Sequence, residues 1–177
     1  MTVSVFPPGE RTGVLVHEPT YLACAAAQGR DADPLALRRS LARLTHVSAL
    51  VYFPGLPGDP EFPQSADTKA AASVAGFRIV EPPAVWSGSY GRCDWSKQQL
   101  AETAVAMVNL SHRVDHILLV SGDAAMTPLV QMVQRMGLRV SVLSSARKRP
   151  RLVADTVRRQ ADQFIEYQDL ERLACPD

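Results

Sequence analysis

The sequence predicts an α/β fold with three layers, doubly wound around a mainly parallel central sheet of about five to six strands. Three observations predict it: short apolar runs recur along the chain, helical patterns lie between them, and Gly, Pro, Ser or Asp residues bound the runs. Short, continuously apolar strands are typical of parallel sheets that helices cover on both faces. Their alternation with helices indicates βαβ units.

Six apolar runs are interpreted as strands. Val, Ile, Leu and Phe dominate them, and each has the length of a buried strand rather than of a helix. The sixth run is the most polar of the set. The runs cover residues 13–16, 47–53, 77–80, 116–120, 139–143 and 164–167.

The first half of the chain shows two helical patterns. Asp33-Pro34 has the residue types of an N-cap followed by proline in the first helical turn. Three leucines at helical spacing then share one face, at positions 37, 41 and 44. An Ala-rich stretch over residues 63–75 ends at Gly76, as is typical of a helix C-terminus.

The second half shows three more helical patterns. Ser96 and Gln99 have the spacing of a capping box, which predicts a helix from Ser96 to about residue 111. Thr127-Pro128 predicts the start of another helix, and Gly137 its end. The last helix is expected to carry Leu152, Val153 and Val157.

Length and composition exclude several classes of protein. The 177 residues predict one domain over residues 1–177, with its core over about 12–170. A chain with 46% hydrophobic and 21% charged residues is not a disordered tail, a collagen-like fibre or a long coiled coil. No apolar run reaches the roughly 18–20 residues of a membrane span, and no secretory leader is expected. A net charge of +1 limits any nucleic-acid binding to a local patch.

The cysteines and the glycine motifs exclude further kinds of site. Cys24, Cys93 and Cys175 are odd in number and form no Cys-x-x-Cys pair. We therefore expect neither a disulfide framework nor a zinc site, and a reducing cytoplasm is the expected compartment. The sequence also lacks the two common glycine-rich phosphate-binding motifs, so a nucleotide cofactor has no support.

The predicted topology sorts the acidic residues by sheet edge. Ligands of open α/β sheets bind outside the carboxyl ends of the strands. Glu18 follows the first strand, Asp94 precedes the helix at Ser96, and Asp123 follows the fourth strand, so these three acids are expected at that edge. Asp115 and Asp162 precede strands and are expected at the opposite edge.

Acids that converge at one edge are what a Mg²⁺ or Mn²⁺ site needs. These hard cations take carboxylate oxygens and keep waters for a phosphate substrate. A bland interpretation stands beside this one, because a carboxylate before a helix is often only an N-cap. Asp94 as a cap or solvated side chain, and Glu18 as a surface residue, are the alternatives.

The segment from Asp115 onward carries a family pattern. An apolar strand ends in Ser121-Gly122-Asp123, and a helix, Gly137-x-x-Val140 and a late Ala161-Asp162-x-Phe164 follow. In order and spacing this segment resembles NYN domains of the LabA type, which belong to the PIN-like nucleases. The resemblance covers about a third of the chain, and implies a PIN-like doubly wound fold and metal-dependent cleavage of RNA phosphodiesters by an acid cluster.

By position, the resemblance makes Asp94 and Asp123 metal-binding acids, but the acid cluster is degenerate. The family's first acid is His17 here, the asparagine that follows it is Thr20, and the second acid after Ser-Gly is Ala125. Each absent carboxylate removes a ligand and neutralising charge. Glu18, as a catalytic acid, and Glu102, as a metal ligand, are the candidate substitutes.

A basic run after the fifth predicted strand is the sharpest charge feature. It is expected at the same edge as Asp123, where cations can hold nucleic-acid phosphates. A solvated loop is the alternative interpretation. The candidate nucleic-acid contacts are Arg147, Lys148, Arg149 and Arg151, together with Lys97 and Ser121.

Two functional hypotheses follow. The first is a metal-dependent endoribonuclease of the NYN, PIN-like class, with Mg²⁺ or Mn²⁺ as cofactor, single-stranded or structured RNA as partner, and reduced activity because acids are missing. The second is a catalytically inactive NYN-like module in RNA binding, protein interaction or regulation as an oligomer, with a homodimer or a protein partner. Neither hypothesis involves a membrane.

Overall fold

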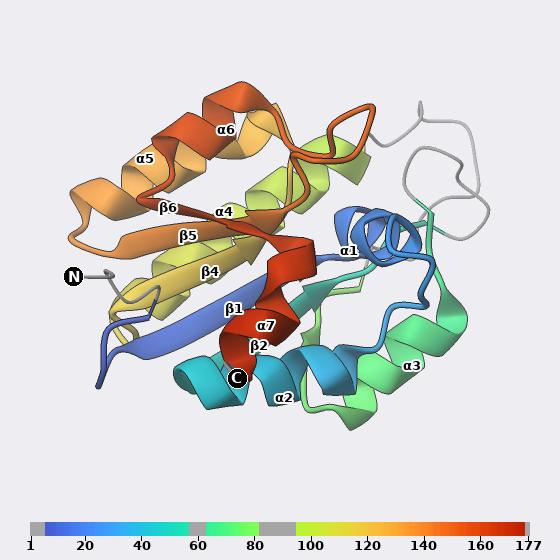
Figure 1. Ribbon diagram of the computed structural model, residues 1–177. Coiled ribbons are helices and arrows are strands. Elements are labelled where there is room, and N and C mark those ends of the chain that lie inside the picture. The colour runs from blue at the N-terminus through green and yellow to red at the C-terminus, as the bar shows by residue number, and fades with distance from the viewer. Residues whose placement is uncertain (1–5, 57–62, 82–94, 176–177) are drawn as a thin grey trace.

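The fold is a parallel sheet between two layers of helices, seen in a computed structural model that describes residues 6–56, 63–81 and 95–175 (Figure 1). All strand pairs are parallel, and the strand order is β3-β2-β1-β4-β5-β6. This confirms the predicted doubly wound α/β fold. The strands are β1 (Arg11–His17), β2 (His46–Phe53), β3 (Arg78–Ile79), β4 (His116–Val120), β5 (Arg139–Ser144) and β6 (Gln163–Glu166).

Helices cover both faces of the sheet. One face holds α1 (Glu18–Ala26), α2 (Pro34–Leu44), α3 (Ala66–Val74) and α7 (Leu170–Ala174). The other holds α4 (Trp95–Ser111), α5 (Thr127–Arg135) and α6 (Asp155–Gln160). Two single 3₁₀ turns, η1 (Ala124–Met126) and η2 (Tyr167–Asp169), follow β4 and β6. Within the described ranges, no helix has the length and apolar character to cross a bilayer.

Central strand β4 joins the two hydrophobic cores. Its side chains alternate between faces, because successive residues of a strand point to opposite sides. Ile117 and Leu119 pack with α4, α5 and α6, whereas Leu118 and Val120 pack with α1 and α2. All four residues are completely buried. A strand buried on both sides reads as a continuous apolar run, and the run at 116–120 was predicted for that reason.

Three predicted helix ends have the expected local chemistry. The Asp33 carboxylate accepts hydrogen bonds from Leu35 N at 2.9 Å and Ala36 N at 3.1 Å, which caps α2. α3 begins later than expected, with Ser65 as its N-cap. Gly76 and Gly137 follow α3 and α5 with φ of 86° and 90°, a region that favours glycine.

Other boundaries differ from the prediction. α4 begins at Trp95, so Ser96 lies inside its first turn and not at the cap. α6 begins at Asp155, so Leu152 and Val153 precede the helix and belong to the connection from β5. The sequence analysis also missed α1 and α7. α1 follows β1 directly, without a loop or turn signal between them.

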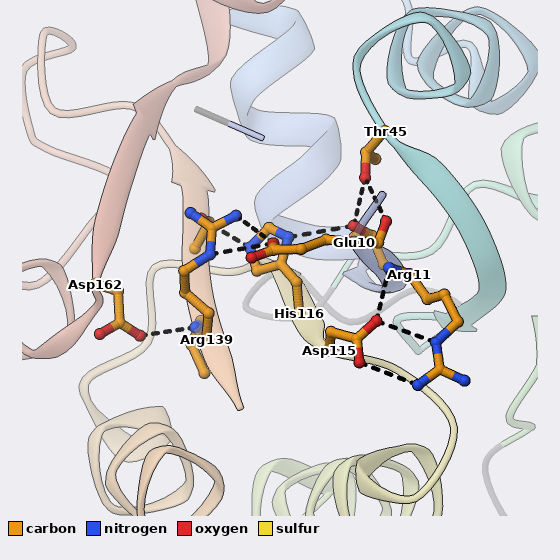
Figure 2. Close-up of polar contacts among 10 residues, drawn as sticks. Glu10, Arg11, Thr45, Asp115, His116, Arg139 and Asp162 are labelled. Atoms are coloured by element: carbon orange, nitrogen blue, oxygen red, sulfur yellow. Dashed lines mark hydrogen bonds and ion pairs between the residues drawn. The ribbon is translucent and has the colours of Figure 1, made fainter. Parts of the chain in front are cut away.

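Ion pairs close the amino edge of the sheet (Figure 2). Asp115 receives two bonds from the Arg11 guanidinium and one from the Arg11 backbone N–H, each at 3.0 Å. Arg139 donates to Glu10 at 2.6 and 3.2 Å. Asp162 accepts from Val140 N at 2.8 Å. These contacts tie β1, β4, β5 and β6 together where the strands begin.

A chain of buried hydroxyls and an imidazole continues this network. Thr45 Oγ1 donates to the Glu10 carbonyl at 3.3 Å, so it accepts from Thr12 Oγ1 at 2.7 Å. Thr12 must then accept from His116 Nδ1–H at 3.2 Å, which leaves His116 Nε2 to accept from Ser141 at 2.9 Å. The carbonyl thereby sets the direction of every bond. The polar groups of this network therefore bond to one another.

Candidate functional site

The carboxyl ends of β1 and β4 are the place where this topology is expected to position a ligand. β1 continues into α1 on one face, and β4 continues through η1 into α5 on the other face. Where adjacent parallel strands lead to opposite faces, their carboxyl ends leave a crevice that binds ligands. The polar residues of these two ends are His17, Glu18 and the segment 121–123.

Asp123 is exposed at the end of β4, as predicted. Its Oδ1 accepts a hydrogen bond from Ala125 N at 2.9 Å and so caps η1. Ala125, where the resemblance expects a second acid, is exposed two residues further on. Ser121 is completely buried, and its hydroxyl accepts from Asp123 N at 3.4 Å. The buried Ser121 hydroxyl therefore stabilises the backbone of the turn at Asp123.

His17 stands where the LabA-type resemblance expects the first acid, and its imidazole is buried. Its Nε2 lies 2.9 Å from Thr103 Oγ1, and the Thr103 hydroxyl donates to the Gln99 carbonyl at 2.7 Å. That hydroxyl has one proton, so His17 Nε2 must carry the proton of its own bond. Burial lowers the pKa of His17 to about 4, and the ring packs edge-on against Phe53. The residue is neutral at pH 7.

Glu18 is a buried clamp between two distant segments. Its Oε2 accepts from Gly55 N at 2.7 Å, just after β2, and its Oε1 accepts from Ser65 N at 3.0 Å, at the start of α3. Burial raises the pKa of this carboxyl group, although both backbone hydrogen bonds favour its charged form. Each oxygen of Glu18 therefore holds a backbone N–H group.

The described residues do not fit a divalent metal ion. Asp94 lies outside them, and Glu102 is half-buried on α4. Over the described ranges, no three His, Cys, Asp or Glu side chains come together as a ligand group. Hard divalent cations need several oxygen ligands at one point. Asp123, with one oxygen engaged by its own turn, does not supply them by itself.

The basic loop, residues 146–152, lies against the Asp123 turn. Ala154 N donates to the Gly122 carbonyl at 2.9 Å, and Leu152 N donates to the Ser145 carbonyl at 2.9 Å. The contact is so close that a Cβ on Gly122 would lie 1.6 Å from Leu152 O, and only glycine fits. The basic loop and Asp123 therefore share the carboxyl edge, as the topology predicted.

Two of the loop's cations are held by acids. Arg147 makes a two-bond pair with Asp169, at 2.8 and 3.2 Å, and Arg151 donates to Asp155 at 3.1 Å. Lys148 and Arg149 have no acidic partner within the part of the chain that the structure describes. The side chain of Lys97, another predicted contact, lies outside the described residues.

Glu166 is a residue that sequence reasoning missed. It ends β6, is buried, and accepts from Ala146 N at 3.0 Å, which fixes the first residue of the basic loop. Its other oxygen, Oε1, is buried without a hydrogen-bond partner in the described structure. The signal in the sequence was weak, because a single Glu at a strand end is also common on the surface.

Comparisons with known proteins agree with this arrangement. The NYN domain family model matches residues 11–171 of the chain. The fold is similar to the crystal structure of a protein of unknown function from Vibrio parahaemolyticus RIMD 2210633, with a TM-score of 0.69 and 22% sequence identity. The alignment covers 91% of this chain and 94% of that one, and it shows a common fold. No curated protein matches the chain.

Proposed function

The chain belongs to the NYN domain family, and from that premise we propose that it binds RNA at the carboxyl edge of its sheet, through the basic loop. The family suggests a nuclease-like function, and the resemblance of residues 115–167 to the LabA type supports RNA as the partner. The binding role has more support than cleavage, since His17 and Glu18 serve the fold. A homodimer and a protein partner stay within the proposal as alternatives.

The observation that supports RNA binding most strongly is the pair of cations Lys148 and Arg149. The loop that presents them is closed by the hydrogen bond from Leu152 N to the Ser145 carbonyl, and Ala154, just after the loop, bonds to Gly122 of the Asp123 turn, so little ordering of the backbone is required on binding. Their charges are not neutralised by acids of the described chain. At the amino edge, by contrast, Arg11 and Arg139 are paired with Asp115 and Glu10. We infer that Lys148 and Arg149 attract RNA phosphates to the carboxyl edge.

The double variant Lys148→Gln/Arg149→Gln tests the RNA site. We expect its affinity for a single-stranded RNA to fall about tenfold at low salt, since two phosphate contacts are lost. The slope of log affinity against log salt should fall by about 0.7 for each lost contact. Fluorescence anisotropy at several salt concentrations measures both quantities.

The matched control is Arg135→Gln/Arg159→Gln, which removes the same charge from exposed positions on α5 and α6. We expect this control to bind RNA like the wild type. Equal losses in the two double variants would mean that net charge alone attracts RNA, and would overturn the assignment of the basic loop.

Phosphodiester cleavage is the second candidate function, and Asp123 is the observation that favours it. An exposed carboxylate at the end of central strand β4 has the position of a family acid. Asp94 and Glu102 are the proposed further acids, with Glu18 as their support. Asp123→Asn keeps a carbonyl oxygen for the cap on Ala125 N but removes the charge.

Single-stranded RNA cleavage with a titration of Mn²⁺ distinguishes the two functions. An enzyme shows metal-dependent cleavage in the wild type and loses it in Asp123→Asn, with RNA affinity retained. A binding module shows RNA affinity without cleavage at any metal concentration. The measurement needs a gel assay on the same RNA that is used for anisotropy.

A further inference from the structure

A groove lies beside the basic loop, on the side of the sheet covered by α1. Its first part has a volume of about 280 Å³ and lies where β5 and β6 end, next to the last turn of α1. Its second part, about 240 Å³, continues toward the start of α2. The two parts share Gln28, Tyr167 and Gln168 as walls, and we call them together the α1 groove. Each approaches the roughly 300 Å³ at which small-molecule sites begin.

The two ends of the α1 groove carry opposite charge. Lys148 and Arg147 line the first part, together with Ser145. Arg147 forms an ion pair with Asp169, so Lys148 is the cation of this part whose charge no acid of the described chain neutralises. The second part is lined by acids. Among them, Asp33 caps α2 and Glu171 pairs with Arg30 at 2.7 Å, whereas Asp31 is exposed and forms no ion pair within the described chain.

The middle of the α1 groove is aromatic and amide-lined. Tyr167 is half-buried, and its ring is braced edge-on by Tyr21, with the ring centroids 6.0 Å apart. Burial raises the pKa of Tyr167 to about 12, so its phenol stays protonated and can donate. Cys24 also lines the first part, and burial raises its thiol pKa to about 12. The Cys24 thiol is therefore uncharged at neutral pH, and it lines the groove without acting as a nucleophile.

From this order of groups we infer that the α1 groove binds one nucleotide through a phosphomonoester at Lys148 and Ser145. A nucleotide has an anionic group at one end, a sugar and base that pack on an aromatic side chain, and amino donors that an acid such as Asp31 accepts. An internal RNA phosphate is linked to a nucleotide on each side, whereas a terminal phosphate is linked to only one. A cavity with room for a single nucleotide therefore favours a terminal phosphate. The inference rests on the proposed RNA-binding function and deepens it, because the groove adjoins the basic loop.

Two adjacent cations separate the groove from the rest of the RNA site. Lys148 lines the α1 groove, but Arg149, the next residue, is exposed and is not among its walls. Lys148→Gln should therefore remove recognition of a terminal phosphate, while Arg149→Gln should weaken all RNAs equally. The two variants lose the same charge from the same loop, so each controls for the other.

The experiment compares short RNAs of one sequence with a 5′-phosphate, a 3′-phosphate or hydroxyl ends, and adenosine monophosphate with adenosine. We expect one phosphorylated end to bind about tenfold more tightly than the hydroxyl form, as a charge-assisted hydrogen bond provides. Lys148→Gln should abolish this ratio and Arg149→Gln should preserve it. Anisotropy measures the RNAs, calorimetry measures the mononucleotides, and circular dichroism checks that each variant is folded.

Each outcome decides the inference. A phosphate preference that depends on Lys148 supports the groove with an RNA end as its ligand; binding of the monophosphate alone supports it with a free nucleotide as its ligand. RNA binding without a phosphate preference, and without mononucleotide binding, overturns the groove but leaves the proposed function intact. Mononucleotide binding without any RNA binding overturns the proposed function but leaves the groove. A preference for the phosphorylated RNA end that persists in Lys148→Gln would overturn the assignment of the α1 groove as the phosphate site.

Discussion

Two buried histidines show how single residues fix both ends of the sheet. His17 donates to Thr103 at the carboxyl edge, and His116 bridges Thr12 and Ser141 at the amino edge. Burial lowers the pKa of His17 to about 4. Burial, reinforced by the charge of Arg139, lowers the pKa of His116 to about 3. Each imidazole is therefore neutral in the folded protein, and its tautomer is set by the hydroxyl that it contacts.

These pKa values predict that the protein loses stability in mild acid. In the unfolded chain both histidines bind a proton below pH about 6.5, but in the folded chain they resist it down to pH 4 or below. Their stabilisation is complete above pH 6.5 and is lost as the pH falls below it. We expect the free energy of unfolding to fall by about 2 kcal/mol for each histidine between pH 7 and 5. Urea unfolding at both pH values measures this.

His112→Gln is the control for this titration, because His112 is exposed. His116→Gln should be less stable at pH 7, where its hydroxyl partners lose the imidazole, but should lose about 2 kcal/mol less than the wild type on going to pH 5. An equal loss in His116→Gln and His112→Gln would show that the buried imidazole is not the group that titrates.

At the scale of elements, the Glu18 clamp joins α1 to the connection between β2 and α3. The carboxylate supplies one acceptor to the end of β2 and the other to the cap of α3. A buried backbone N–H without an acceptor costs about 1–3 kcal/mol. These two backbone hydrogen bonds explain why the carboxyl group of Glu18 is tolerated in the core, where a carboxylate without partners would be unfavourable.

Glu18→Gln should destabilise the protein by about 1–3 kcal/mol, since an amide has one acceptor oxygen for two backbone donors. Hydrogen exchange should increase at Gly55 and Ser65. The control is Glu102→Gln on α4. Glu102 is half-buried and has no hydrogen-bond or ion-pair partner among the described residues, so we expect a change within about 0.5 kcal/mol. Loss of RNA cleavage in Glu18→Gln at unchanged stability would instead support the catalytic role that the sequence suggested.

The strands were easier to predict than the helices that accompany them. The run at 116–120 is apolar at every position but the first, and it matches β4 residue for residue. α1 lacks such a signal, since Glu18 opens it directly after a strand and its other residues are mostly small. Its buried face is made by Tyr21 and Cys24, and only the sheet shows that this face points inward. Local periodicity cannot supply that information.

The sequence was sufficient to predict at which edge of the sheet each candidate residue lies, but not which residues contact one another there. Strand order places Asp123 and the basic loop at one edge and Asp115 and Asp162 at the other, and this followed from positions relative to the strands. The partners of Glu18 are 37 and 47 residues away in sequence, and no spacing rule indicates them. The convergence of Asp94 with Asp123 stays a prediction, because Asp94 lies outside the described residues.

At the scale of the whole molecule, we expect the amino edge of the sheet to contribute to stability and the carboxyl edge to contribute to RNA binding. At the amino edge, Asp162 accepts from Val140 N at 2.8 Å and from the Gln134 amide at 2.9 Å, which joins β6 to β5 and α5. Asp162→Ala leaves the Val140 N–H without its acceptor, so we expect a loss of about 1–3 kcal/mol in unfolding free energy and no change in RNA affinity. Lys148→Gln/Arg149→Gln should do the reverse.

Measuring both quantities in both variants makes the division testable. Urea unfolding gives the stability of each, and anisotropy with one single-stranded RNA gives the affinity, at a temperature where each variant is folded. The physical reason for the division is the pairing of charges: Arg11, Arg139 and Asp162 already have partners at the amino edge, whereas Lys148 and Arg149 have no acidic partner in the described chain. A folded Asp162→Ala protein that has lost RNA affinity would place the RNA at the amino edge and would refute the topological assignment of the site.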